Sequence, residues 1–141
     1  MKITIQGEYI TKFGEIWDKS LRDLLTEAIL GAVKNSNINL HEVEAVFVAN
    51  MGSGIIENQL HLGALASSLF PHHPAGVRVE GACASGGLAM IAAEQSLLSE
   101  TYQTVMVVGV EKMTDHKPED VATALMGAGT EGERLSGATF P

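Results

Sequence analysis

The sequence has few of the residues that many classes of protein depend on. It holds one cysteine among 141 residues, which excludes an internal disulfide and a cysteine-rich zinc site and suggests a reducing compartment, the cytoplasm. Nine Lys and Arg stand against seventeen Asp and Glu, a formal net charge of −8. Nucleic acid and anionic membranes attract clustered basic residues, so neither is expected as a partner. No apolar run approaches the roughly 18 residues of a membrane span, and Met1–Trp17 lacks the apolar core of a signal peptide.

The sequence does have enough apolar material for one folded domain. Hydrophobic residues make up 45% and charged residues 18% of the chain. This balance excludes a disordered acidic segment and is typical of a globular protein with a substantial core.

The clearest predicted element is a helix that begins after Ser20. Ser20 and Asp23 form an approximate capping box, and the asparagines from Asn35 onward end the helix, since short polar side chains compete with helical backbone bonds. One face carries apolar residues at helical spacing, namely Leu21, Leu24, Leu25, Ala28, Ile29, Ala32 and Val33.

Strands and helices alternate along the chain. The alternation in Ile3–Ile5 predicts a first strand, and the continuous apolar run Ala45–Ala49 predicts a strand covered on both faces. Further strands are predicted at Val77–Val79 and Val105–Val110, and further helices at about Asn58–Phe70 and Ala84–Ser99. This βαβαβαβ order predicts an α/β fold with a mainly parallel sheet flanked by helices.

The periodic pattern fades after Glu111. Residues 112–141 are rich in glycine and carry only a short helical pattern at Val121–Leu125. We therefore expect an αβ domain over residues 1–111 and a separate loop region over residues 112–141.

Cys83 is the strongest candidate for a reactive residue. It lies between a predicted strand and a predicted helix, where unpaired N–H groups and the helix dipole stabilise a thiolate and can hold a developing oxyanion. The nearby Gly81, Gly86 and Gly87 leave room for an acyl group. The alternative from position alone is a buried cysteine that acts as a small hydrophobic residue.

Two segments give Cys83 a family context. The motif EGACASGG at residues 80–87, with VMVVGVEKMTD at residues 105–115, resembles the N-terminal half of the thiolase family. Within the family, the chain is most similar to the archaeal and sterol-carrier-type thiolases. Many members carry Asn three residues before the cysteine, whereas this chain has Glu80, as in the sterol-carrier-type branch.

The resemblance implies a thiolase-like fold and acyl transfer between CoA thioesters. Cys83 would accept the acyl group, with its own N–H as one oxyanion donor, and CoA thioesters would be substrates, with no metal and no further cofactor. Residues that bind CoA are not assigned. A homodimer or tetramer is implied, because the strand at Val77–Val79 corresponds to one that pairs across a two-fold axis in thiolases.

The resemblance also implies that part of the catalytic machinery lies elsewhere. Thiolases are well over twice as long, and their catalytic histidine and second cysteine belong to the C-terminal half. We therefore expect the segment 1–141 alone to lack turnover and to need a C-terminal half, which would cover apolar residues such as Leu88, Ile91 and Leu98.

Two alternatives stay open at this point. The chain could be a ketoacyl-synthase-like condensing enzyme, although the VEKMT segment favours a thiolase. It could instead be a non-catalytic subunit or scaffold in a complex of acyl-CoA enzymes.

The remaining polar motifs favour structural roles. His72 and His73 stand next to each other without a carboxylate or cysteine at ligand spacing, so a loop is expected instead of a metal site. The Gly52-x-Gly54 pair lacks the rest of a phosphate-binding motif and predicts a turn. The acidic residues after the last strand predict a solvated surface that Lys112 and Lys117 partly neutralise, namely Glu111, Asp115, Glu119 and Asp120.

Overall fold

The computed structural model describes residues 2–139, and its centre is a sheet of three parallel strands. The strands are β1 (Ala45–Ala49), β2 (Ala75–Val79) and β3 (Val105–Gly109), in the order β2-β1-β3. Phe47 on the central strand lies opposite Val77 on one side and Val107 on the other. The predicted α/β class with a parallel sheet is therefore confirmed.

Six α-helices and three short 3₁₀ helices complete the part of the chain that the structure describes. The α-helices are α1 (Leu21–Lys34), α2 (Ser53–Ile56), α3 (Leu62–Ser67), α4 (Ser85–Leu98), α5 (Pro118–Leu125) and α6 (Glu131–Leu135). The 3₁₀ helices are η1 (Leu40–Glu42), η2 (Ala82–Ala84) and η3 (Met126–Ala128). None of the helices between residues 2 and 139 is long and apolar enough to cross a membrane.

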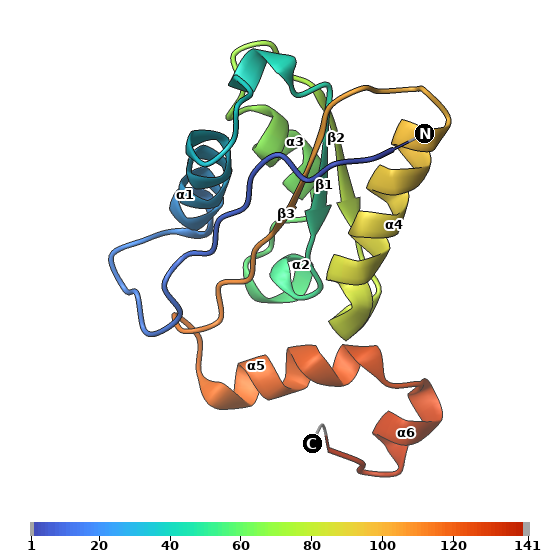
Figure 1. Ribbon diagram of the computed structural model, residues 1–141. Coiled ribbons are helices and arrows are strands. Elements are labelled where there is room, and N and C mark those ends of the chain that lie inside the picture. Colours follow the sequence, from blue (N-terminus) through green and yellow to red (C-terminus); the bar gives the residue numbers. More distant parts are fainter. Residues whose placement is uncertain (1, 140–141) are drawn as a thin grey trace.

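Helices cover the sheet on both faces (Figure 1). Helices α1 and α3 lie on one face, where Val46 and Val48 of β1 pack with Leu25 and Leu62. Helix α4 lies on the other face, where Phe47 packs with alanines of that helix. All five residues of β1 are buried, as its unbroken apolar run predicts.

The capping of α1 follows the sequence prediction. The Ser20 hydroxyl accepts a hydrogen bond from the Asp23 N–H, and the Asp23 carboxylate accepts one from the Ser20 N–H at 2.9 Å. The Ser20 hydroxyl also donates to the Asp23 carboxylate at 2.6 Å. This bond, followed by the bond from the Ser20 backbone N–H, holds the pKa of Asp23 below its usual value. Asn35 is the C-cap, as predicted.

One predicted element is wrong and another is shorter than predicted. Residues 3–5 form no strand, since the segment makes no sheet hydrogen bonds among the described residues and Ile5 is exposed. The helix predicted at about Asn58–Phe70 is present as α3, but it starts only at Leu62 and ends at Ser67. It starts late because Asn58 adopts a positive φ of 51° and the Gln59 N–H donates back to the Ser53 carbonyl.

Helix α4 buries one side and leaves the other open. Its alanines Ala89 and Ala93 face the sheet, while Leu88, Ile91 and Leu98 are 41%, 50% and 52% exposed. These three apolar side chains are therefore exposed in this segment, as expected. The helix therefore presents an apolar outer face that residues 2–139 leave exposed.

The chain continues past the sheet into α5 and α6, which lie beyond the N-terminal end of α4 (Figure 1). Helix α5 contains the predicted helical segment Val121–Leu125. The division into residues 1–111 and 112–141 stays a prediction, and residues 140 and 141 lie outside the described residues.

Candidate functional site

The carboxyl ends of the three parallel strands meet at one edge of the sheet. Asn50 follows β1, the loop that contains Cys83 follows β2, and Glu111 lies just beyond β3. In open α/β sheets this edge is where ligands bind. The candidate site is therefore built on the loops at this edge.

Cys83 lies in η2, directly before α4, and is exposed to solvent. The expected position at the start of a helix is confirmed, and the alternative of a buried hydrophobic cysteine is wrong. The sulfur therefore sits where the helix N-terminus favours negative charge.

The loop around Cys83 is held by its own side chains. Ala82 has a positive φ of 50°, and its N–H donates to the Glu80 carboxylate at 2.6 Å. The Ser85 hydroxyl donates to the Ala82 carbonyl at 2.7 Å and accepts from the Gly81 N–H at 3.0 Å. Among the described residues, the Cys83 N–H has no hydrogen-bond acceptor.

Open space surrounds the start of α4. A side chain placed at Gly86 or Gly87 would meet no atom within 4 Å, whereas one at Gly81 would meet Leu88 Cδ1 at 2.2 Å. The two helix glycines therefore face open space, and the glycine before Cys83 makes room for Leu88. That this space receives an acyl group stays a prediction.

A buried polar cluster at the end of β1 supports the same edge of the sheet. Asn50 is buried, donates to the Val110 carbonyl at 2.7 Å and accepts from the Ser53 N–H and hydroxyl. The Glu111 carboxylate accepts hydrogen bonds from the N–H groups of Met51 and Gly52. Gly52 is the N-cap of α2, so the predicted turn opens a short helix. The sequence signalled this cluster only by an asparagine after an apolar strand.

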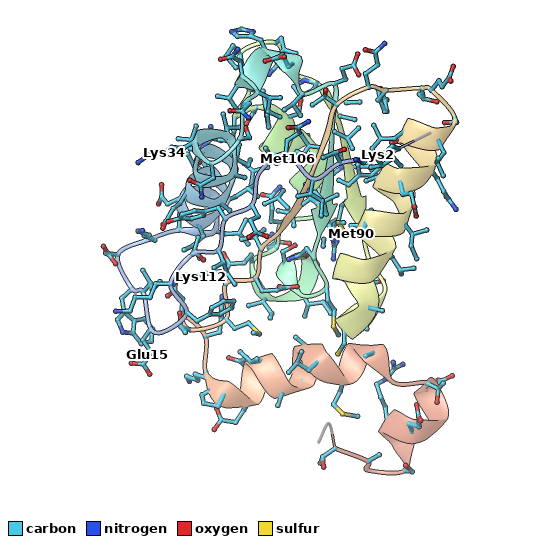
Figure 2. The ribbon with its side chains drawn as sticks, viewed as in Figure 1. Lys2, Glu15, Lys34, Met90, Met106 and Lys112 are labelled. Atoms are coloured by element: carbon cyan, nitrogen blue, oxygen red, sulfur yellow. The ribbon has the colours of Figure 1, made fainter. Side chains whose placement is uncertain are left out.

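Lys112 is the main correction to the predicted acidic surface. It is 3% exposed, and its ammonium group contacts Asp115 at 2.8 Å. The same group donates to the Ile16 carbonyl at 2.8 Å and lies 5.9 Å from the centre of the Trp17 ring. Figure 2 shows Lys112 between the segment before α1 and the segment after β3. The lysine is buried because it joins these two segments.

Two of the five histidines bond to residues far away in the sequence. His72 lies in a turn and shares a hydrogen bond with the Val43 carbonyl at 2.8 Å, while His116 contacts the Glu57 carboxylate at 2.9 Å. No group of three potential metal ligands occurs within residues 2–139. The turn at Pro71–His72 agrees with the loop predicted there.

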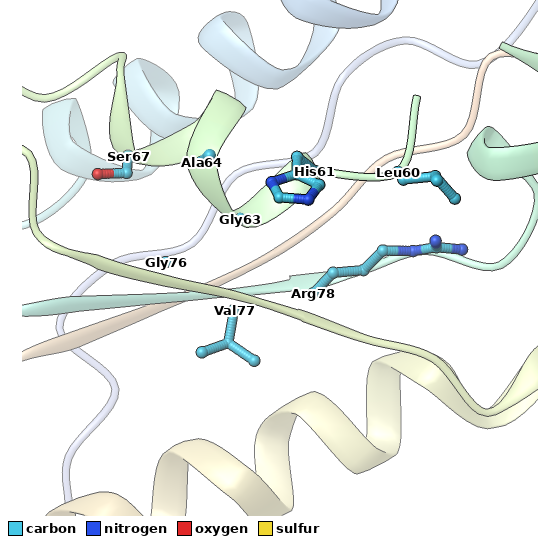
Figure 3. Close-up of a pocket in the computed structure, with 8 residues that line it drawn as sticks. All are labelled: Leu60, His61, Gly63, Ala64, Ser67, Gly76, Val77 and Arg78. Atoms are coloured by element: carbon cyan, nitrogen blue, oxygen red, sulfur yellow. The ribbon is translucent and has the colours of Figure 1, made fainter. Parts of the chain in front are cut away.

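An open hollow of about 510 Å³ lies beside the edge strand β2 (Figure 3). Its lining comes from α3, the residues before it and β2, and ends at Arg78, before the cysteine loop. The Arg78 Nη2 group donates to the Met51 carbonyl at 2.8 Å. The hollow therefore lies at the β2 edge of the sheet, and the residues that line it do not include those of the Cys83 loop.

Comparison with known proteins places this arrangement in context. The family described as "Thiolase, N-terminal domain" matches residues 3–141. An acetyl-CoA acetyltransferase of Methanothermobacter thermautotrophicus is 39% identical over 140 residues, and one of Methanocaldococcus jannaschii is 40% identical over 141 residues. Each alignment covers 99% of this chain and 36% of the relative. The chain thus spans about a third of the length of these relatives.

Proposed function

The chain belongs to the thiolase family, matching its N-terminal domain, and we propose that it supplies the acyl-accepting cysteine for acyl transfer between CoA thioesters. The observation that carries the proposal is the exposed Cys83 at the start of α4, beside an N–H that has no acceptor among the described residues. The acetyl-CoA acetyltransferase name of both relatives supports acetyl-CoA as the substrate.

The first half-reaction follows from this geometry. The Cys83 thiolate attacks the thioester carbonyl carbon, a sulfur–carbon bond forms, and the negative charge moves to the carbonyl oxygen. The Cys83 N–H stabilises that oxyanion. The bond between the carbonyl carbon and the CoA sulfur then breaks, and CoA leaves as a thiolate that takes up a proton. The product is an acyl group on Cys83.

The second half-reaction needs groups beyond those near Cys83. A base removes a proton from the α-carbon of a second acetyl-CoA, and the carbanion attacks the carbonyl carbon of the acyl group. A carbon–carbon bond forms, the bond from that carbon to the Cys83 sulfur breaks, and acetoacetyl-CoA is released with Cys83 again a thiolate. General acid–base catalysis contributes about 10²- to 10⁴-fold. His72 and His116 are engaged by Val43 and Glu57. We propose that the base comes from a C-terminal thiolase half, and that no metal or cofactor besides CoA takes part.

Two open surfaces support an assembled enzyme. The outer face of α4 exposes large apolar side chains, which typically mark an interaction site. Strand β2 is a sheet edge with Val77 half-exposed, and such an edge is a template for pairing with another strand. We propose that the α4 face contacts the C-terminal half, that β2 contacts a second copy of the chain, and that the assembly works in the cytoplasm.

Incubation with acetyl-CoA tests the proposal. Because Cys83 is the one cysteine of the chain, we expect a single acetyl group per chain by intact mass, with one equivalent of CoA released. Cys83→Ala should abolish both signals, while the matched control Ala84→Ser should keep them. Acetylation that persists in Cys83→Ala would contradict the role of Cys83. Sustained acetoacetyl-CoA formation by residues 1–141 alone would contradict the need for a second half.

A further inference from the structure

The residue that precedes the cysteine has an unusual backbone conformation. Ala82 has φ of +50°, a left-handed conformation in which the Cβ of any residue other than glycine crowds the following carbonyl group. Such a conformation persists only when surrounding groups hold it in place. The contacts of Ala82 therefore identify what shapes the loop that presents Cys83.

Two side chains hold Ala82, one at its N–H and the other at its carbonyl group. The Glu80 carboxylate accepts the Ala82 N–H at 2.6 Å, and the Ser85 hydroxyl donates to the Ala82 carbonyl at 2.7 Å. The same hydroxyl also accepts the Gly81 N–H at 3.0 Å. Ser85 is buried, so water does not compete freely for its two bonds, whereas the bond of Glu80 is exposed.

The hydrogen bonds of the loop leave the cysteine free. The N–H groups of Gly81, Ala82 and Ala84 all have acceptors within the loop. Among residues 2–139 the Cys83 N–H has none, and the Cys83 side chain is exposed. The loop thus pairs the neighbouring N–H groups, while the N–H and the thiol of Cys83 stay available.

We propose that Glu80 and Ser85 are positioning residues for Cys83, which hold Ala82 left-handed so that the thiol stays exposed and its N–H stays unpaired. This inference rests on the proposed role of Cys83 as the acyl acceptor. It assigns Glu80 the work of a hydrogen-bond acceptor, because its negative charge by itself would disfavour a nearby thiolate.

The rate of Cys83 alkylation by iodoacetamide tests the inference on the intact protein, at one pH, by mass spectrometry. Glu80→Gln keeps an acceptor without the charge and should react at least as fast as the wild type. Glu80→Ala keeps neither, and should react about fivefold more slowly than Glu80→Gln, the factor expected for one lost hydrogen bond. Adding Ala82→Gly to Glu80→Ala should restore the rate to within about twofold of Glu80→Gln, because glycine adopts a positive φ without crowding.

A matched serine separates positioning from general stability. Ser96 lies in the same helix, and its hydroxyl donates to the Ala93 carbonyl at 2.7 Å. Ser85→Ala loses two hydrogen bonds and Ser96→Ala loses one, so both should lower the melting temperature, Ser85→Ala the more. Only Ser85→Ala should slow alkylation, by about fivefold. If Glu80→Ala does not fold, Ser85→Ala with and without Ala82→Gly gives the same comparison.

The outcomes distinguish this inference from the proposed function. Equal alkylation rates for Glu80→Ala and Glu80→Gln, or no recovery with Ala82→Gly, would overturn the positioning roles. Acetylation by acetyl-CoA is measured in parallel on the same variants. A wild-type protein that is alkylated but never acetylated would overturn the acyl-acceptor role, while the alkylation series would still decide the positioning roles.

Discussion

Helix α3 and strand β2 touch through their backbones, and Gly76→Ala should force them apart. A Cβ at Gly76 would lie 2.1 Å from the Gly63 carbonyl oxygen and 2.7 Å from its carbonyl carbon. Alanine at Gly63, on the helix side of this contact, would meet the same obstacle, since a Cβ there would lie 2.4 Å from the Gly76 carbonyl oxygen. The obstructing atoms are backbone on both sides, so no side-chain rotation relieves the clash.

The cost of Gly76→Ala follows from this geometry. The two elements must separate by roughly 1 Å, and overpacking of this kind typically costs about 1–3 kcal/mol. The loss falls at the layer where Leu62 and Ala66 of α3 pack into the core. For a chain of this size we expect the melting temperature to fall by about 3–15 °C.

Thermal unfolding followed by circular dichroism measures the effect, with Gly87→Ala as the matched control. Gly87 lies within α4 and a Cβ there meets no atom within 4 Å. Since alanine favours a helix over glycine by about 0.5–1 kcal/mol, Gly87→Ala should raise the melting temperature of the isolated chain. A Gly76→Ala variant as stable as the wild type would refute the close approach of α3 and β2.

Three further changes test other parts of the molecule. Asn50→Ala leaves the Val110 carbonyl without its donor and should cost about 1–3 kcal/mol in urea unfolding, so an unchanged midpoint would contradict the buried bond. The lowered pKa of Asp23 means that its carboxylate stabilises the fold above its ordinary pKa of about 3.9 and loses this effect as the pH falls through the lowered value. The stability advantage of wild type over Asp23→Asn at pH 7 should therefore shrink as the pH falls below about 3.9. Ile91→Gln, at a half-exposed position, should change the stability of the chain by less than about 0.5 kcal/mol and reduce self-association in light scattering.

The elements that the sequence predicts well depend on local patterns. The spacing of Leu21, Leu25 and Ile29 reports directly which face of α1 is buried, and Ser20 marks its start. The position of Cys83 follows from the junction of an apolar strand and an Ala-rich helix, which needs only neighbouring residues.

The elements that it predicts poorly depend on distant partners. Residues 3–5 have the composition of a strand, but a strand also needs an adjacent backbone to pair with. The sequence predicts Lys112 on the surface, because neighbouring residues give no sign of its acceptor, the Ile16 carbonyl, which is 96 positions away. The late start of α3 has a local cause instead, because the turn in which the Gln59 N–H donates to the Ser53 carbonyl places Asn58 at a positive φ.

The single Lys112 side chain has a consequence for the order in which the molecule folds. It bonds to a carbonyl 96 positions earlier, and closing so long a loop has a high entropy cost until the sheet has already brought the two segments together. The segment before α1 should therefore order last. Its amide hydrogens should exchange with solvent at lower opening energies than those of β1, and a protease should cut there before it reaches the core.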